Sequence, residues 1–120
     1  MEKDCPTILA FQYAPIGILM SEHRVIVDYN DRFQETFGYG DRDMRGQSLE
    51  LLYPSVQDFD HIGDTLPDKM KTSGRHWDER LMKRASGELF WCRVRGQTLS
   101  PGAPFEKAIW TFADLSEVRP

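Results

Sequence analysis

The sequence predicts an α+β fold in which a five-stranded antiparallel sheet carries short helices on one face. The first observation is the order of the elements: two strand-like runs, then several short helical segments, then three more strand-like runs. The second is size and composition. With 120 residues, of which 40% are hydrophobic and 12% aromatic, the chain can build one packed core but not two. We therefore expect a single domain.

Charge and cysteine content exclude several classes of function. A net charge of -4 gives no positive field for phosphates, so we expect no nucleic-acid binding by this domain. Cys5 and Cys92 are the two cysteines, and their wide separation predicts neither a disulfide framework nor a zinc site. No apolar run is long enough to span a bilayer, and the N-terminus does not read as a secretory signal. These features favour a cytoplasmic protein without membrane contact.

The first third of the chain predicts a helix, a hairpin and a second helix. Thr7 can cap a short helix that ends before Pro15. Residues 16–20 and 25–29 are two apolar runs joined by a polar turn, which is typical of a β-hairpin. Asn30 is placed to cap the next helix, and Gly38 is placed to end it in the left-handed conformation.

Three further helical segments are expected in the middle of the chain. Asp41 can cap a single turn that runs to residue 46, and Ser48 can cap another turn before Pro54. A longer amphipathic helix is indicated by apolar residues three and four apart, namely Val56, Phe59, Ile62, Leu66 and Met70. Because Pro67 removes the hydrogen bond to the Gly63 carbonyl, we expect a kink or break there.

The last third predicts three strands. Residues 77–84 and 89–99 form a second hairpin around a turn at 85–88, and residues 107–114 form the final strand after a loop rich in Pro and Gly. In the final strand, Trp110 and Phe112 alternate with apolar neighbours, so both faces of the strand are apolar. One face should cover the core, and the other should meet a helix or a second subunit.

Four segments resemble PAS domains and occur in the PAS order. They are "YAPIGILM" (13–20), "NDRFQETFGYGDRDMRG" (30–46), "RASGELFWCRV" (84–94) and "IWTFADLSE" (109–117). The resemblance implies a PAS sensory fold over residues 15–117, preceded by an N-terminal helical cap (1–14) and followed by the start of a linker (118–120). It also implies a pocket between the helices and the concave face of the sheet, and an output module joined to the sheet after residues 114–117.

The resemblance, combined with strand alternation, gives two sets of candidate residues. The ligand-pocket candidates are Phe33, Ile62, Leu66, Met82, Cys92, Val94, Trp110 and Phe112. The dimer or signalling surface is expected to include Ile8, Leu9, Phe11, Trp91, Ile109, Thr111 and Asp114. Gly63 and Gly96 favour a cavity because each removes side-chain volume. Filling of a solid core by the same residues is an equally good interpretation.

The expected ligand is a small, mostly apolar metabolite, and no cofactor is required. The flavin–cysteine photochemistry of light-sensing members needs a reactive cysteine after Gly46, where this sequence has Leu49, so that chemistry is excluded. Haem-binding members take a ligand from the long helix, where the histidine is His61; an exposed histidine is the more ordinary interpretation. Cys92 is interpreted as a small buried hydrophobic residue.

The resulting functional hypothesis is a dimeric, non-enzymatic sensor that relays a signal to a C-terminal output domain. A bacterial LuxR-type transcriptional regulator is the favoured context, with a diguanylate cyclase or a histidine kinase as alternatives. A ligand-free dimerisation module and a small isomerase-like enzyme remain open. The enzyme would need a buried acid, for which Asp78 is the one candidate near the concave face; no other catalytic motif is present. Arg80 is expected to pair across strands at the surface.

Overall fold

The computed structural model describes residues 5–116, which form one curved sheet with the helices of residues 31–70 against its concave face. The elements in chain order are α1 (Pro6–Gln12), β1 (Gly17–Glu22), β2 (Val25–Tyr29), α2 (Asp31–Phe37), η2 (Leu49–Leu52), α3 (Val56–Met70), β3 (Arg75–Lys83), β4 (Leu89–Thr98) and β5 (Ala108–Asp114). The predicted linker at 118–120 and the first four residues lie outside the described residues.

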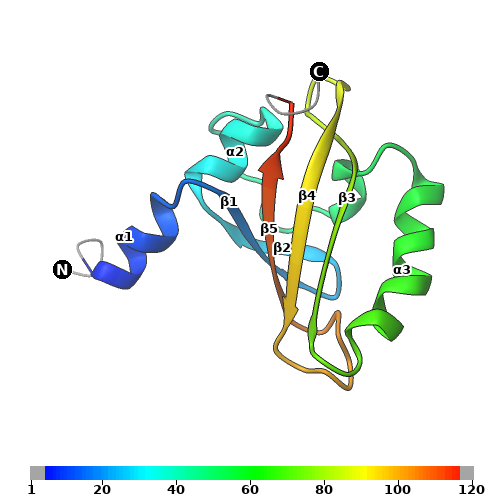
Figure 1. The fold of residues 1–120 in the computed structure, drawn as a ribbon. Helices are drawn as coiled ribbons and strands as arrows, with labels where there is room; N and C mark the ends of the chain where they lie inside the picture. Colours follow the sequence, from blue (N-terminus) through cyan, green and yellow to red (C-terminus); the bar gives the residue numbers. More distant parts are fainter. Residues whose placement is uncertain (1–4, 117–120) are drawn as a thin grey trace.

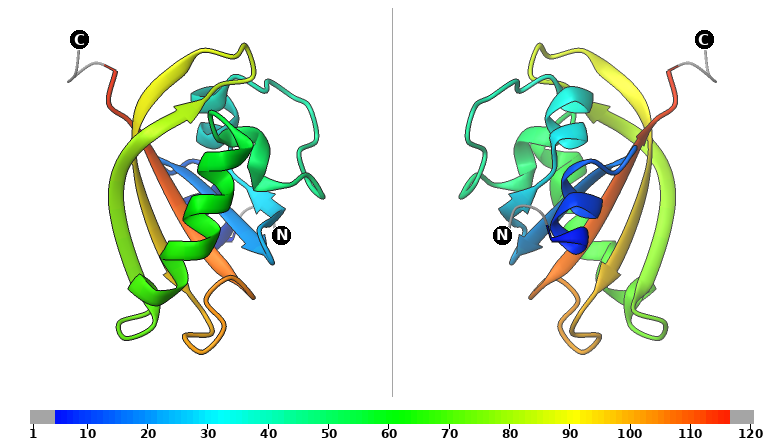
Figure 2. Two further views of the ribbon diagram at one scale, coloured as in Figure 1. Left: turned by 90° about the vertical axis from the view of Figure 1, so that its right-hand side faces the viewer. Right: turned by 90° about the vertical axis from the view of Figure 1, so that its left-hand side faces the viewer.

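The sheet confirms the predicted α+β architecture. Its strand order is β2-β1-β5-β4-β3, and every neighbouring pair is antiparallel. The last strand in the sequence, β5, therefore lies in the centre of the sheet, between β1 and β4. Figure 2 shows the strong curvature of the sheet, with α3 running across its hollow side. In Figure 1, α1 extends away from this body, and none of its residues is buried.

Asn30 begins α2 as predicted and also joins three segments of the chain. Its Oδ1 accepts the N–H of Phe33 at 3.1 Å, which is the helix cap, and the N–H of Ile18 at 2.9 Å. Its amide nitrogen donates to the carbonyls of Phe11 and Ile16 at 2.8 and 3.0 Å. Because Asn30 is fully buried, these bonds satisfy a polar group that would otherwise be costly. Gly38 ends the helix at a φ of 78°, as predicted.

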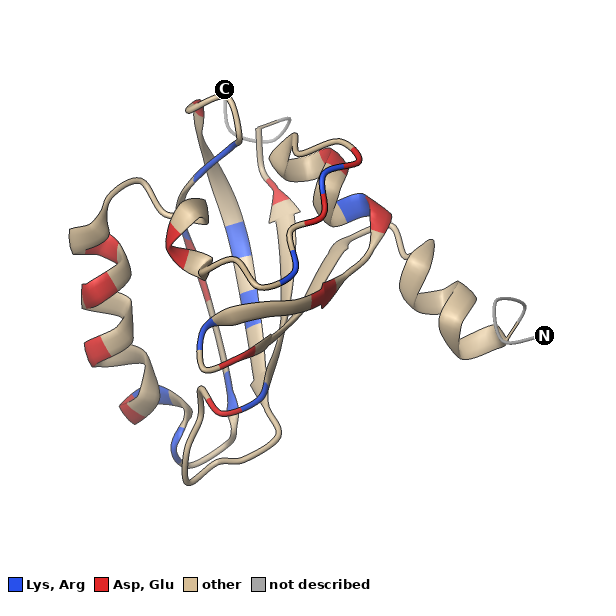
Figure 3. Cartoon of the chain, turned by 180° about the vertical axis from the view of Figure 1, so that it is seen from behind, with Lys and Arg blue, Asp and Glu red and all other residues tan. Residues whose placement is uncertain are grey.

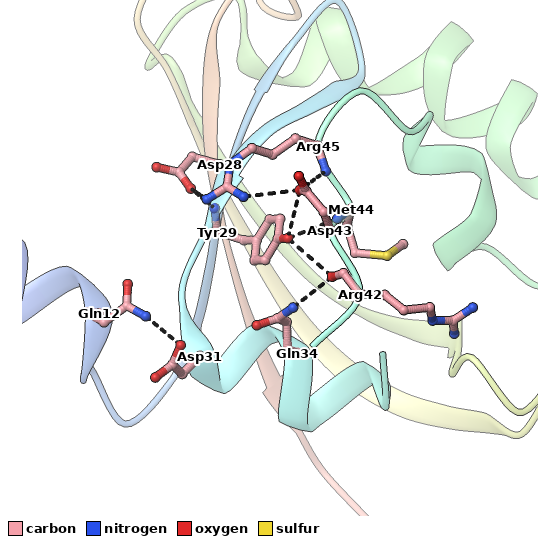
Figure 4. Close-up of polar contacts among 9 residues, drawn as sticks. All are labelled: Gln12, Asp28, Tyr29, Asp31, Gln34, Arg42, Asp43, Met44 and Arg45. Atoms are coloured by element: carbon pink, nitrogen blue, oxygen red, sulfur yellow. Dashed lines mark hydrogen bonds and ion pairs between the residues drawn. The ribbon is translucent and has the colours of Figure 1, made fainter. Parts of the chain in front are cut away.

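The one-turn helix expected at 41–46 is wrong, because side chains from earlier elements bond the backbone of this segment instead. Figure 4 shows that the Tyr29 hydroxyl accepts the Met44 N–H at 2.9 Å, while Gln34 donates to the Arg42 carbonyl at 2.9 Å. Arg45 pairs with Asp28 at 2.9 Å and lies over the Tyr29 ring. These bonds hold the segment as an irregular loop with a turn at 45–46 in place of a one-turn helix.

Two other helix predictions need correction. Helix α1 begins two residues earlier than expected, with Cys5 at the cap position and no side-chain cap bond, so Thr7 does not cap it. Helix α3 continues through Pro67 without a break. Leu66 and Met70 lie on either side of that proline and are both buried, so core packing holds the two halves in one helix. The cap of η2 by Ser48 is confirmed.

Candidate functional site

The space between the helices and the sheet is almost entirely filled. Seven of the eight predicted pocket residues are buried, and Ile62 is half-buried. A cavity of about 10 Å³ remains among them. Four predicted residues line it, together with residues from η2 and β3 that were not predicted; the lining consists of Leu49, Leu52, Tyr53, Arg80, Met82, Val94, Trp110 and Phe112. Such a volume holds about one water molecule.

Gly63 and Gly96 do not mark empty space, contrary to expectation. A Cβ placed on Gly96 would collide with the six-membered ring of Trp110, which lies directly opposite on β5. A Cβ on Gly63 would collide with the guanidinium of Arg24 from the β1–β2 turn. Each glycine is small because a large side chain from another element occupies its place.

The concave side of β3 carries a polar cluster. Arg80 donates two hydrogen bonds to Asp78, at 2.7 and 2.6 Å, and one to the Tyr53 hydroxyl at 3.3 Å. His76 lies 3.1 Å from the same carboxylate. Arg80 thus lies inside, and its predicted surface pairing is wrong; Arg93 and Glu79 make the cross-strand pair on the outer face at 2.7 Å. Arg80 lies two residues before the buried Met82 on the same strand, so both side chains point to the same face of the sheet, and this alternation could have indicated its inward position.

The cluster fixes the charge state of its members. Burial alone would raise the pKa of Asp78, but the hydrogen bonds and charge of Arg80, with a smaller contribution from His76, hold that pKa below its usual value. Burial likewise opposes the charge of Arg80, yet Asp78 and Tyr53 raise the Arg80 pKa. Asp78 is therefore an ion-paired carboxylate and lacks the raised pKa expected of the free buried acid that the enzyme hypothesis requires.

Arg24 lies at the edge of this interior in a cage of aromatic rings. Its guanidinium carbon is 3.6 Å from the centre of the Phe59 ring, 4.9 Å from that of Phe105 and 5.8 Å from that of Tyr53. Its Nη2 is buried and finds no hydrogen-bond acceptor within the described part of the chain. Sequence reasoning missed this cage, because its rings come from three separate places: the residue that follows η2, helix α3 and the β4–β5 loop.

Arg84 ties the end of β5 to the rest of the domain. It bonds the Asp114 carboxylate at 2.8 Å, the Ser116 hydroxyl at 3.3 Å and, from the other side, the Thr36 carbonyl of α2 at 2.6 Å. Its guanidinium also lies 3.9 Å from the centre of the Phe90 ring. Burial alone would raise the pKa of Asp114, but Ser116 and Arg84 lower it overall. This arrangement is called the exit junction below.

The predicted dimer residues are exposed or half-buried. Trp91 is 41% exposed on the outer face of the sheet, where a shallow hollow of about 470 Å³ is lined by residues that include Trp77, Ile109 and Thr111. Ile8 and Leu9 are exposed on α1, and Phe11 is half-buried. Asp114 belongs to the exit junction rather than to this apolar face.

The histidine predicted as a possible haem ligand does not line the interior cavity. His61 is exposed on α3, among Asp58, Asp60 and Asp64, and Figure 3 shows acidic residues along the length of this helix. The interior cavity is also far too small for a porphyrin. Within residues 5–116, no cluster of three metal-ligating side chains occurs, and no helix is long and apolar enough to cross a membrane.

Cys92 is fully buried, as expected. Burial, with a smaller contribution from Asp114, raises the pKa of its thiol to about 12. Leu49, at the position where light-sensing members need a cysteine, is buried in the core.

Comparison with known proteins places this geometry in a family. A family model described as "PAS domain" matches residues 15–117. The PAS domain of a LuxR-family transcriptional regulator from Burkholderia thailandensis, solved in complex with ethanol, is 47% identical with a TM-score of 0.86, covering 89% of this chain and 95% of that one. A PAS domain from Colwellia psychrerythraea, 20% identical, shares the fold with a TM-score of 0.78 over 90% of this chain and 92% of that one.

Among curated proteins, the sensor protein TdiS of Thauera aromatica is 34% identical over 107 residues. This match covers 89% of the chain but 20% of TdiS, so the chain spans about one fifth of that relative. The matched relatives are a sensor and a regulator, which fits a sensory rather than an enzymatic role. The family match, the shared fold and these identities together show that the chain belongs to the PAS-domain family.

Proposed function

We propose that this PAS domain is an input module that binds a small molecule beneath α3 and transmits its presence through the exit junction. The observation that carries the proposal is Arg84, which bonds both the Thr36 carbonyl of α2 and the Asp114 carboxylate at the end of β5. Phe33 and Phe37 of α2 pack against Phe112 of β5, with ring centres 5.9 and 5.1 Å apart. A change in the interior would thus reach the residues that leave the sheet.

The proposed ligand is small, because the resting cavity holds about one water molecule. The complex of the LuxR-family PAS domain with ethanol supports a small guest. Binding of anything larger requires α3 to move outward. The fully buried residues of α3, Leu66 and Met70, both lie in the C-terminal half of the helix. The N-terminal half is therefore anchored less firmly and can move outward.

The proposed output is a DNA-binding module of the LuxR type, supported by the 47% identity to the Burkholderia domain; the likeness to TdiS makes the output of a sensor protein the alternative. We also propose that the domain acts as a homodimer. The exposed apolar residues of α1 and the outer sheet face, including Ile8, Leu9 and Trp91, would cover one another between two copies. Sedimentation velocity at rising concentration tests this, and a monomer at every concentration would refute it.

The near absence of a cavity favours a second candidate, a ligand-free dimerisation module. An ¹⁵N NMR screen with ethanol, other short alcohols and neutral apolar fragments distinguishes the two. Ligand sensing predicts that at least one compound shifts the interior amides of Met82 and Val94 in a saturable way. If none does so, while the dimer persists, sensing of a neutral ligand is refuted and the dimerisation module is favoured.

A further inference from the structure

We infer that the domain recognises a small organic carboxylate, which binds to the guanidinium of Arg24 beneath α3. This inference rests on the proposed function and names the chemical class of its ligand. It starts from the buried Nη2 of Arg24, which has no acceptor within residues 5–116. A buried polar group without a partner is uncommon in folded proteins and calls for a physical reason.

The surrounding rings leave the buried Nη2 of Arg24 without a hydrogen-bond acceptor. Phe59 lies 3.6 Å and Phe105 lies 4.9 Å from the guanidinium carbon, so aromatic rings occupy the space around the cation. A guanidinium donates its hydrogen bonds in its own plane, along an edge that matches the two oxygens of a carboxylate. An ammonium or another cation would be repelled by Arg24 itself.

The charged groups beneath the helices also carry an excess of positive charge. Two guanidiniums lie near Tyr53: that of Arg24 is 5.8 Å from the centre of its ring, and that of Arg80 donates to its hydroxyl. One carboxylate, Asp78, faces them from the sheet, and it is already bonded by Arg80 and by His76. Arg24 therefore has no counterion from the described residues, although the domain as a whole is acidic. An anionic ligand would supply the missing charge.

Arg24 occupies a position where another residue type would suit the backbone conformation better. His23 and Arg24 form the two-residue turn between β1 and β2, and their φ values are 50° and 64°, respectively. Such turns favour Asn followed by Gly. Gly63 on α3 leaves the room that the Arg24 side chain occupies. A residue with an unfavourable backbone conformation whose side chain reaches an internal cage is consistent with a binding role.

The test is binding of benzoate and acetate, with benzamide and acetamide as neutral analogues of the same shape and benzylamine as a cationic one. Ionic strength is matched with NaCl. We expect the carboxylates to raise the melting temperature and to shift the Arg24 Nε–Hε resonance, and the amides and the amine to do neither. Arg24→Met should weaken carboxylate binding at least about tenfold, since it removes a hydrogen-bonded charge.

Arg42→Met is the matched control, because Arg42 also lies over an aromatic ring, that of Tyr39 at 4.9 Å, but on the exposed surface. It should bind like the wild type. If Arg24→Met does not fold, Arg24→Lys and the wild-type Nε–Hε signal provide the same comparison.

Three results would overturn the inference. They are equal binding of benzoate and benzamide, preferential binding of benzylamine, and no effect of any carboxylate on the Arg24 resonance. Each leaves the proposed sensing of a neutral ligand standing, because the alcohol and neutral-fragment screen decides that separately. No binding in that screen, with carboxylate binding intact at Arg24, would show that the sensed ligand is anionic and would leave this site standing.

Discussion

Replacing Gly96 by alanine should destabilise the domain, although alanine normally suits a strand better than glycine. Gly96 lies in β4, between β3 and β5, so its backbone is held by hydrogen bonds on both sides. A Cβ there would meet the Trp110 ring, which must then rotate. Rotation would break the buried hydrogen bond from Trp110 Nε1 to the Ser21 hydroxyl, which is 2.9 Å long.

The magnitude follows from opposing contributions. Overpacking a well-filled core costs about 1–3 kcal/mol, and loss of a buried hydrogen bond costs about 1 kcal/mol. The intrinsic preference of a strand for alanine over glycine offsets about 0.5–1 kcal/mol of this. We expect a net loss of about 2 kcal/mol in the free energy of unfolding, which lowers the melting temperature by about 6–10 °C in a domain of this size.

Urea denaturation followed by far-UV circular dichroism measures this loss. Gly102→Ala is the matched control, because a Cβ on Gly102 meets nothing within 4 Å. Adding Trp110→Leu to Gly96→Ala should cost less than the sum of the two single changes, since both act on the same contact. Equal stability of Gly96→Ala and Gly102→Ala would refute the packing of Trp110 over Gly96.

Three further predictions follow from local chemistry. His23→Asn should raise the free energy of unfolding by up to about 1 kcal/mol, because asparagine tolerates the φ of 50° that His23 adopts; an unchanged urea midpoint would contradict this. Asp78→Asn should lose stability at pH 7, where the ionised carboxylate pairs with Arg80. Because the folded pKa of Asp78 is lowered, its stabilisation exists above the unfolded pKa of about 4 and disappears as pH falls through the lower folded value, so the two urea midpoints should converge in acid. Ellman's reagent at pH 8 should react with one thiol in the native domain and two in urea, because hydrogen bonds from the backbone of Ile8 and Thr7 lower the pKa of Cys5 while that of Cys92 is raised; slow reaction of both would be the contrary result.

The architecture was predictable because periodicity and caps determine it locally. Alternation placed Cys92, Val94, Trp110 and Phe112 on one face of the sheet, and all four are buried. The helix between Asn30 and Gly38 followed from the two residues that bound it. In these places each local signal agrees with the tertiary structure.

The errors arose where a distant side chain decides the outcome. The segment 41–46 is an irregular loop because Tyr29 and Gln34, at least eight positions away from the residues they contact, bond its backbone. Gly63 and Gly96 suggested empty space, since the sequence does not tell which side chain fills the place of a missing Cβ.

Arg80 and Arg24 show the same limit for the site. Charged side chains are normally assigned to the surface, and that rule outweighed the strand parity of Arg80. The cage around Arg24 takes its rings from three separate segments, so no spacing in the sequence reveals it.

The most direct test of the account compares two amides during one titration. Val94 reports on the interior, and Leu115 reports on the exit junction, where its N–H bonds the Trp91 carbonyl at 2.9 Å. In ¹⁵N spectra recorded with increasing ethanol or benzoate, both amides should shift with the same saturation curve in the wild type. In Arg84→Met, Val94 should still shift and Leu115 should not. Saturation at Val94 without any change at Leu115 in the wild type, or no shift at either amide, would contradict the proposed path from interior to exit.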